Sequence, residues 1–395
     1  MPQHICMIAY TNYATDARVR RAAETLASLD SYEVSVLALK EGAEPRSYRL
    51  QGVCVEELNI SKYRGKSGFK YIFSYLNFTI RAFFRLNIML LGNGLDIVHV
   101  HNMPNFLVLA AVLPKLFGRK IILDIHDTMV ETYLAKFDSG GSRTILKILR
   151  LEERLSCALA DELICVNHIQ CQALTARKIP REKITVVINA PDPRIFHRGE
   201  KPPAGDNSNN SNKFKLIYHG TIAKRLGIDL TIKAVSMLTS KIPQIEFCIF
   251  GNGDDKAEFI ECCKHECMND HVFFRDEVPL EQLVGILEQM DLGVISNRKN
   301  IATELMLPVK MLECIAVDIP VVVPRLKAIE HYFSEDMVYY FQPDDVDSLA
   351  NAILKAYEEG AKRREKAANA RVFLQAYGWD AHKYDLINLY HKLSH

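Results

Sequence analysis

The order of apolar and polar residues along the chain predicts short strands that alternate with helices. Apolar, mostly β-branched runs are typical of parallel strands that helices cover on both faces. In the first half, the predicted strands are Ile5–Ala9, Glu33–Leu39, Asp96–His101, Lys120–Ile125, Glu162–Val166 and Ile184–Ile188. Helical repeats lie between them, at Ala17–Leu29, Asn105–Phe117, Ser142–Ala160 and Ile169–Lys178. This alternation favours a doubly wound α/β domain.

The alternation stops once and then resumes. Gly199–Lys213 is rich in Pro, Gly, Asn and Ser and holds no large apolar residue, which is typical of a linker. Beyond it, the predicted strands are Lys215–His219, Glu246–Gly251, His271–Phe274, Leu292–Ser296, Pro320–Val323 and Val338–Phe341. The helices predicted in this half are Ile228–Ser240, Asp254–Cys267, Leu280–Gln289, Val309–Val317 and Val346–Glu359.

We therefore expect two Rossmann-like domains, residues 1–198 and 214–378, joined by a linker at residues 199–213. Ligands of open α/β sheets bind outside the carboxyl ends of the strands, so the sequence predicts a cleft between the two domains as the ligand site. A final helix within residues 379–395 is expected to cross back to the first domain.

Composition and charge narrow the function classes. The formal net charge of this 395-residue chain is +1, so no global field favours nucleic acid. We expect neither a signal peptide nor a membrane-spanning helix, which needs roughly 20 apolar residues. The ten cysteines are then expected to be reduced thiols in the cytoplasm. No metal is expected, because the cluster at Cys262, Cys263, His265 and Cys267 lacks the paired spacing of a zinc site. No cofactor is expected either.

The segment Leu307–Val323 carries the most informative candidate chemistry. It predicts a helix followed by a buried strand, with Lys310 and Glu313 three residues apart near the helix start. Backbone N–H groups at a helix start favour an anion, so Lys310 suits a phosphate there. Glu313 suits ribose hydroxyls, which would donate to its carboxylate. A surface ion pair on an ordinary helix is the alternative.

Two turns that contain glycine follow strands in the second half. Gly220 would let the backbone approach a ligand closely, and Lys224 and Arg225 come soon after it. Arg225 offers a bidentate fork for phosphate oxygens, although both cations would also suit a solvated surface loop. Gly251 and Gly253 form a second turn, whose pattern lacks the third glycine of a dinucleotide fingerprint.

The first half carries candidate residues after two strands. His126 and Asp127 come at a strand end, where residues that face a ligand belong. A histidine there either bonds a sugar hydroxyl or leaving group, or is buried against a carboxylate. Asp16 and Arg18 follow the first strand. Asp16 suits a helix N-cap, whereas a cation in the first helical turn opposes the helix dipole and suggests an anionic ligand.

A basic and aromatic stretch, residues 59–95, has no acidic residue. It predicts either an amphipathic helix on an anionic bilayer surface, through residues 62–91, or a helical hairpin packed on the first domain. Its cations are Lys62, Arg64, Lys66, Lys70, Arg81 and Arg85.

Together, these segments resemble GT-B glycosyltransferases of the retaining family 4 type, especially those that build bacterial surface polysaccharides. The resemblance runs nearly from end to end, and its most specific segment is LPVKMLECIAVDIPVVVP. The segments that carry it are residues 16–21, 99–127, 219–230, 251–253 and 307–324.

The resemblance implies a nucleotide sugar bound mainly by the C-terminal domain and an acceptor bound mainly by the N-terminal one. Glu313 is then the ribose carboxylate, and Arg225 and Lys310 are the diphosphate cations. The histidine that contacts the donor sugar is His126. The remaining implied residues are Gly220, Lys224, Gly251, Gly253 and Glu304 on the donor side, and Asp16, Arg18 and Asp127 on the acceptor side.

Two positions depart from the family pattern. A second glutamate often stands eight residues before the ribose carboxylate, and Leu305 occupies that position here. Glu304 is one residue away and is the candidate replacement. The usual glycine pair after the first strand is also absent, because the chain reads Ala9-Tyr10-Thr11-Asn12. The contact made there is expected to differ.

We therefore expect a hexosyltransferase that uses a UDP- or GDP-sugar and retains the anomeric configuration. Its acceptor is expected to be a glycan or a lipid-linked sugar in surface polysaccharide synthesis. The expected location is the cytoplasm, at the inner face of the plasma membrane. A nucleotide-sugar 2-epimerase and a non-catalytic adaptor with the same fold are the alternatives.

Overall fold

The computed structural model describes residues 2–63, 68–92, 94–137, 142–197, 213–266 and 268–394. They form two compact units, Met1–Ile188 with His382–His395, and Asn189–Ala381, and each is described by itself. Residues 189–197 thus belong to the second unit rather than to the first. The predicted linker lies outside the described residues except for Lys213, as do Arg64, Lys66 and Cys267.

Unit 1 is built on one sheet with the order β3-β4-β2-β1-β5-β6-β7-β8 among its described residues. All neighbouring strands are parallel except β3 and β4, which form an antiparallel edge. The strands are β1 (Gln3–Ala9), β2 (Tyr32–Leu39), β3 (Ser47–Leu50), β4 (Val53–Leu58), β5 (Ile97–His101), β6 (Lys120–Ile125), β7 (Glu162–Cys165) and β8 (Ile184–Val186).

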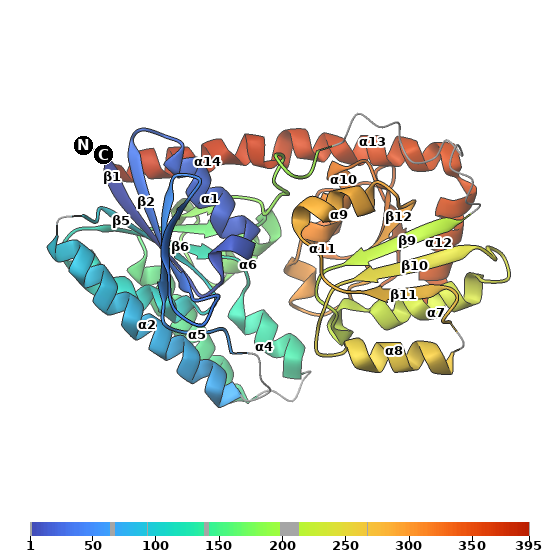
Figure 1. The fold of residues 1–395 in the computed structure, drawn as a ribbon, viewed down its shortest axis with the longest axis horizontal. Helices are drawn as coiled ribbons and strands as arrows, with labels where there is room; N and C mark the ends of the chain where they lie inside the picture. The colour runs from blue at the N-terminus through green and yellow to red at the C-terminus, as the bar shows by residue number, and fades with distance from the viewer. Residues whose placement is uncertain are drawn as a thin grey trace. The chain divides into compact units, whose positions relative to one another are not determined.

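Helices connect the parallel strands of unit 1 (Figure 1). They are η1 (Tyr13–Thr15), α1 (Ala17–Ala27), α2 (Gly68–Leu91), η2 (Asn105–Ala111), α3 (Val112–Leu116), α4 (Met129–Phe137), α5 (Arg143–Leu159), α6 (His168–Ala176) and η3 (Arg181–Lys183). The last helix of the chain, α14 (Trp379–Ser394), also packs on this unit. Its Tyr390 is fully buried against Tyr32 of β2 and bonds His99 of β5.

Two features of unit 1 differ from the sequence-based expectation. The edge strand β3 and its neighbour β4 were not predicted, because polar residues interrupt their short apolar runs and Glu57 is buried. The helical hairpin proposed as one alternative for residues 59–95 is wrong. Residues 68–91 form the single helix α2, whose Phe78, Ala82 and Leu86 are fully buried.

Unit 2 repeats the same architecture. Its described strands form a parallel sheet with the order β11-β10-β9-β12-β13-β14. They are β9 (Phe214–His219), β10 (Ile245–Phe250), β11 (Val272–Arg275), β12 (Leu292–Val294), β13 (Val321–Pro324) and β14 (Tyr339–Phe341). The helical segments are η4 (Lys224–Leu226), α7 (Ile228–Leu238), α8 (Lys256–His265), α9 (Leu280–Leu287), η5 (Thr303–Leu305), α10 (Val309–Ala316), α11 (Lys327–Glu330), α12 (Val346–Glu358) and α13 (Gly360–Tyr377).

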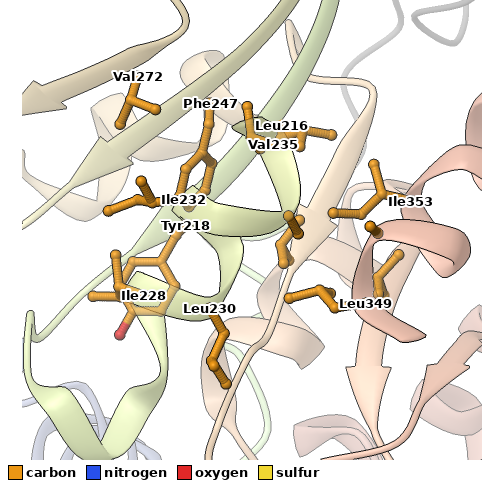
Figure 2. Close-up of a cluster of buried hydrophobic side chains, with 14 of the residues drawn as sticks. Leu216, Tyr218, Ile228, Leu230, Ile232, Val235, Phe247, Val272, Leu349 and Ile353 are labelled. Atoms are coloured by element: carbon orange, nitrogen blue, oxygen red, sulfur yellow. The ribbon is translucent and has the colours of Figure 1, made fainter. Parts of the chain in front are cut away.

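The core of unit 2 fixes the positions of its strand ends. Figure 2 shows Leu216 and Tyr218 of β9 among apolar side chains of α7 and α12. The strands of this sheet are largely apolar on both faces because helices cover both faces, as is typical of parallel sheets. The Tyr218 ring is part of this core, whereas its hydroxyl reaches polar partners at the end of β9.

Both units are thus doubly wound α/β domains, as the alternation of apolar runs predicted. Parallel strands bring their carboxyl ends to one edge, so residues that follow different strands meet there. Among the described residues, no helix is long and apolar enough to cross a membrane.

Candidate active site

Two backbone turns lie against each other at the carboxyl edge of the unit 2 sheet. The Gly220 N–H donates to the Phe250 carbonyl at 2.8 Å, and the Ile222 N–H donates to the Asn252 carbonyl at 2.9 Å. A Cβ on Gly251 would lie 1.9 Å from the Gly220 oxygen, and one on Gly253 would lie 2.0 Å from the Ile222 oxygen. These glycines are therefore required for close packing of the two turns, whatever else they contact.

Lys310 approaches the same edge from the first turn of α10. Its Nζ donates to the Tyr218 hydroxyl at 2.6 Å and lies 4.0 Å from the centre of the Tyr218 ring. The Tyr218 hydroxyl in turn donates to the Thr221 carbonyl at 2.5 Å. Gly220 has a φ of +103°, which favours glycine, and a Cβ there would be in ordinary contact with Lys310 Nζ at 3.7 Å. The amine is thus fixed beside the turn that follows β9.

The electrostatic setting of Lys310 is unusual for a lysine. Burial lowers its pKa to about 7, with Arg225 acting in the same direction and Glu313 opposing the change. An amine with such a pKa gains its charge most readily when an anion arrives beside it. The arrangement therefore suits a phosphate better than a permanent internal ion pair.

Glu313 lies one helical turn after Lys310 and is held by a histidine. Its Oε2 is 2.7 Å from Nε2 of His219, the last residue of β9. His219 is 5% exposed and is fixed by the strand, so it orients the carboxylate. Glu313 keeps a partly exposed side chain, and a carboxylate can accept several hydrogen bonds at once. It is therefore free to accept hydrogen bonds from hydroxyl groups.

The two cations after β9 have different surroundings. Lys224 Nζ pairs with Glu258 of α8 at 2.7 Å, and both side chains are more than half exposed. Arg225 is also exposed but forms no ion pair with a described residue, although its charge acts on Lys310 and Tyr218. Of the two, Arg225 is the cation that the structure brings together with Lys310. The predicted donor role of Lys224 stays a prediction.

Glu304 has structural partners in the described chain. It lies in η5, where its Oε2 accepts the Lys327 N–H at the start of α11 at 2.9 Å, and its Oε1 is 3.3 Å from Lys299 Nζ. The side chain is 12% exposed. A carboxylate that caps a helix and pairs with a lysine has less freedom to replace the family glutamate at the position of Leu305. Its predicted contact with the donor stays a prediction.

In unit 1, the predicted residues Arg18 and His126 are joined through Asp124 at the end of β6. Arg18 donates to both Asp124 oxygens, at 2.7 and 2.9 Å, and His126 Nε2 lies 3.1 Å from Oδ2. His101 Nδ1 lies 3.3 Å from the same oxygen. Arg18 is only 6% exposed, and its guanidinium orients Asp124. Its predicted acceptor-side role stays a prediction.

The charges in this cluster keep Asp124 ionised. Burial opposes ionisation of Asp124, but Arg18 and His126 outweigh it and hold the pKa of that carboxyl well below its ordinary value. Burial lowers the pKa of His101, so that imidazole is neutral. Because Asp124 is ionised, it accepts a hydrogen bond from the His126 Nε2–H that faces it. This bond orients the His126 ring.

Asp16 and Asp127 are placed less specifically. Asp16 is the N-cap of α1, and its Oδ1 accepts the Val19 N–H at 3.1 Å. Asp127 follows His126 with an exposed side chain. The amide of Asn102 fixes this turn, because it donates to the Asp127 carbonyl at 2.7 Å and accepts the His126 N–H at 2.8 Å. Contact of either carboxylate with an acceptor stays a prediction.

His99, His101 and Asp124 also form a group whose ligand atoms lie within 4.8 Å of one another. Arg18 occupies both Asp124 oxygens, and His99 Nδ1 bonds the Tyr390 hydroxyl at 2.7 Å. A cation would have to compete with the guanidinium at both oxygens. The contacts in the described chain therefore favour a hydrogen-bonded cluster over a metal site.

Sequence reasoning missed several of the residues that hold the candidates in place. Asp124, Asn102 and His219 each lie close to a predicted residue in space, and the latter two are distant from it in sequence. Asp124 had a recognisable signal, since it lies near the end of a buried strand, two residues before His126. Tyr390, which bonds His99 beside this cluster, had none, because the contact spans 291 positions.

Two family models match the chain in succession. The model of glycosyl transferase 4-like domains matches residues 15–190, and the model of group 1 glycosyl transferases matches residues 204–373. The two matches fall on the two doubly wound sheets. The chain therefore belongs to the GT-B glycosyltransferases that carry a group 1 domain.

Solved structures and curated relatives agree with that family. Sucrose-phosphate synthase from Thermosynechococcus elongatus superposes with a TM-score of 0.79 at 17% identity, over 99% of each chain. Anabaena HepE in complex with UDP-glucose reaches 0.71 at 14% identity, over 98% of this chain and 99% of that one. One phosphatidylinositol N-acetylglucosaminyltransferase polypeptide of Arabidopsis thaliana is 24% identical over 264 residues, which are 66% of this chain and 54% of that one. The chain spans about half the length of the curated relatives it matches.

Proposed function

We propose that this chain transfers a hexosyl group from a nucleotide sugar to a hydroxyl acceptor, with retention of the anomeric configuration. The observation that carries the proposal is the group of Lys310, Arg225 and Glu313 at one sheet edge. At that edge, the amine of Lys310 has a lowered pKa, and the guanidinium of Arg225 forms no ion pair with a described residue. The carboxylate of Glu313 is oriented by His219. This combination matches a diphosphate linked to a ribose.

The chemistry follows from charge. Breaking the glycosidic bond leaves negative charge on the diphosphate and oxocarbenium character on the sugar. Lys310 and Arg225 would stabilise the growing charge, which is the electrostatic role that usually contributes most. His126 would contact a hydroxyl of the donor sugar, with Asp124 holding its ring in place. Asp16 and Asp127 are the proposed acceptor-side carboxylates, and Arg18 acts through Asp124 as a positioning residue.

The donor is proposed to be a UDP- or GDP-sugar. Structures of HepE are complexes with UDP and UDP-glucose, and Arabidopsis starch synthase IV is bound to ADP, so the fold accommodates several nucleotides. The acceptor is proposed to be a glycan or a lipid-linked sugar in surface polysaccharide synthesis. The relation to phosphatidylinositol N-acetylglucosaminyltransferase is a point in favour of a lipid-linked acceptor.

A thermal-shift screen across UDP, GDP, ADP and their sugars identifies the donor, because a ligand of the native state raises its melting temperature. Turnover of that donor is then compared between wild type, Arg225→Ala and Lys233→Ala. Lys233 is an exposed lysine of α7 in the same unit and serves as the control. We expect Arg225→Ala to lower kcat by about 100-fold or more with an unchanged melting temperature.

The products separate this proposal from its alternatives. A new glycoside whose anomeric carbon keeps the donor configuration, as measured by NMR, supports retention. Conversion of the donor into its epimer, without an acceptor, would identify an epimerase. Nucleotide binding without any turnover across an acceptor panel would favour a non-catalytic adaptor. Equal kcat for Arg225→Ala and wild type would reject the assigned diphosphate site.

A further inference from the structure

Unit 1 exposes large apolar side chains in a concentrated pattern. Of the twenty large apolar residues that are exposed in the described chain, fifteen lie between residues 69 and 155. Single exposed apolar residues are common on soluble proteins, but a continuous patch marks a contact surface. We therefore expect this surface to contact a partner, and its apolar and charged residues indicate which kind of partner.

The patch is organised as two helical stripes. On α2, eight exposed residues form one line, at spacings of three or four except for the adjacent pair Ile72 and Phe73: Phe69, Ile72, Phe73, Leu76, Ile80, Phe84, Ile88 and Leu91. The opposite side of α2 is buried, so this stripe faces away from the core. On α5, the corresponding line is Ile145, Ile148, Leu151 and Leu155. Spacings of three and four place each set on one helical face.

The two stripes belong to one layer of unit 1. Helices α2, α3 and α5 belong to the successive crossovers β4–β5, β5–β6 and β6–β7, which all advance in the same direction across the sheet. Right-handed crossovers of this kind place their helices on the same face. The segment η2 packs against both α2 and α5, and its Leu109 is 49% exposed. We call this layer the α2–α5 face.

The charges of the α2–α5 face are of one sign. Helix α2 has no acidic residue, and the two acidic residues of α5 have inward partners. Glu153 is buried against Arg177, and Glu152 is half-buried and accepts from Asn105. The exposed ionisable residues of the two helices are therefore all cations: Lys70, Arg81, Arg143, Lys147, Arg150 and Arg154. Those of α5 form a stripe beside its apolar line.

We infer that the α2–α5 face binds the surface of an anionic lipid bilayer. Apolar side chains that enter the headgroup boundary, flanked by lysine and arginine, are the combination that holds a helix in the plane of a membrane. A second copy of the chain fits less well, because an interface between two such faces would bring like charges together. The inference concerns a surface of unit 1 and does not depend on the identity of the donor.

Vesicle flotation tests the inference with the full-length protein. The vesicles are phosphatidylcholine alone, and phosphatidylcholine mixed with an equal part of phosphatidylglycerol. We expect binding to the anionic vesicles that weakens at high ionic strength. Phe73→Gln/Phe84→Gln should weaken binding at least tenfold. The control pair Met237→Gln/Val372→Gln, also exposed but in unit 2, should bind as wild type does.

A second set of variants isolates the charge. Removing three cations in Lys147→Gln/Arg150→Gln/Arg154→Gln should lower affinity for anionic vesicles by on the order of 100-fold, about fivefold for each cation. The control, with the same change of charge in unit 2, is Lys233→Gln/Lys241→Gln/Lys355→Gln, which should lose little.

Three results would overturn the inference. They are a failure of wild type to float with either vesicle, equal losses in the face and control variants, and a stable dimer in light scattering that Phe73→Gln/Phe84→Gln dissociates. For the same variants, the melting temperature reports folding, and its rise on addition of nucleotide reports donor binding. A variant that loses vesicle binding but keeps both values tests the α2–α5 face alone. A wild type whose melting temperature does not rise with any nucleotide contradicts the proposed function alone.

Discussion

The lowered pKa of Lys310 leads to a prediction about the pH dependence of nucleotide binding. The pKa falls from 10.5 to about 7, chiefly because the side chain is buried. A shift of one unit corresponds to about 1.4 kcal/mol, so keeping this amine charged in the empty protein costs on the order of 5 kcal/mol. A phosphate charge about 4 Å away returns roughly 4 kcal/mol at an effective dielectric constant of 20. The bound diphosphate should therefore restore the charge.

The sign of the effect follows from proton linkage. Below pH 7, Lys310 is already protonated in the free protein, so affinity does not depend on this group. Above pH 7, binding must take up a proton, and affinity should fall about tenfold per pH unit until the pKa of the bound state is reached. The charge of the nucleotide is constant in this range, because the second pKa of a phosphate is about 6.

Isothermal titration calorimetry measures both consequences. At pH 8, titrations in two buffers with different ionisation enthalpies should report uptake of nearly one proton, and Kd at pH 9 should be up to about 100-fold weaker than at pH 7. Lys310→Arg should keep some affinity and lose the pH dependence, because arginine stays charged. Lys310→Met should bind at least tenfold more weakly at pH 7.

The same shift makes a separate prediction about stability. Between pH 7 and 10.5 the unfolded chain holds more protons at this position than the folded one, so Lys310 lowers stability most below pH 7. Lys310→Met should therefore raise the melting temperature of the empty protein at pH 6, and this gain should shrink at high pH. An affinity that is constant from pH 7 to 9, without proton uptake, would refute the reasoning about the amine.

Three further predictions concern residues that hold the site together. His219→Leu should raise the nucleotide Kd about tenfold, because Glu313 loses its partner, and a kcat that falls while Kd is unchanged would contradict this role. Gly251→Ala should lower the free energy of chemical unfolding by about 2 kcal/mol or more, because the new Cβ would clash with the Gly220 backbone. Gly285→Ala on α9, whose Cβ would have no atom within 4 Å, should leave that free energy unchanged or raise it. Tyr390→Phe should lower unfolding free energy by about 1 to 2 kcal/mol, and an unchanged value would show that its buried hydrogen bond contributes nothing.

Several features of the fold follow from the local pattern of apolar and polar residues. The strands β6 and β9 begin or end within one residue of the predicted limits, because uninterrupted apolar runs report burial on both faces. The pair Lys310 and Glu313 was also recognised from sequence, because residues three apart on a helix are neighbours in any fold that forms the helix. The outer stripe of α2 follows from the same kind of local repeat.

Other features were decided only by tertiary packing. The sequence placed Arg18 with a ligand, but the structure gives it Asp124 of another strand as its partner. Glu304 was a candidate for the donor, and the structure shows that its carboxylate also accepts the Lys327 N–H at the start of α11. In both cases the partner is distant along the chain, and no local pattern records which distant group satisfies a buried charge.

The order of residues along the chain thus specifies the two doubly wound sheets and the segments whose strand ends carry polar residues. Periodicity and turn chemistry are local, so one chain suffices to reveal them. Folding of the whole unit sets how each candidate is oriented: His219 on Glu313, Tyr218 beside Lys310, and Asp124 facing His126. Those contacts arise where separate strands end at a common edge, and only packing of the whole sheet brings them into register.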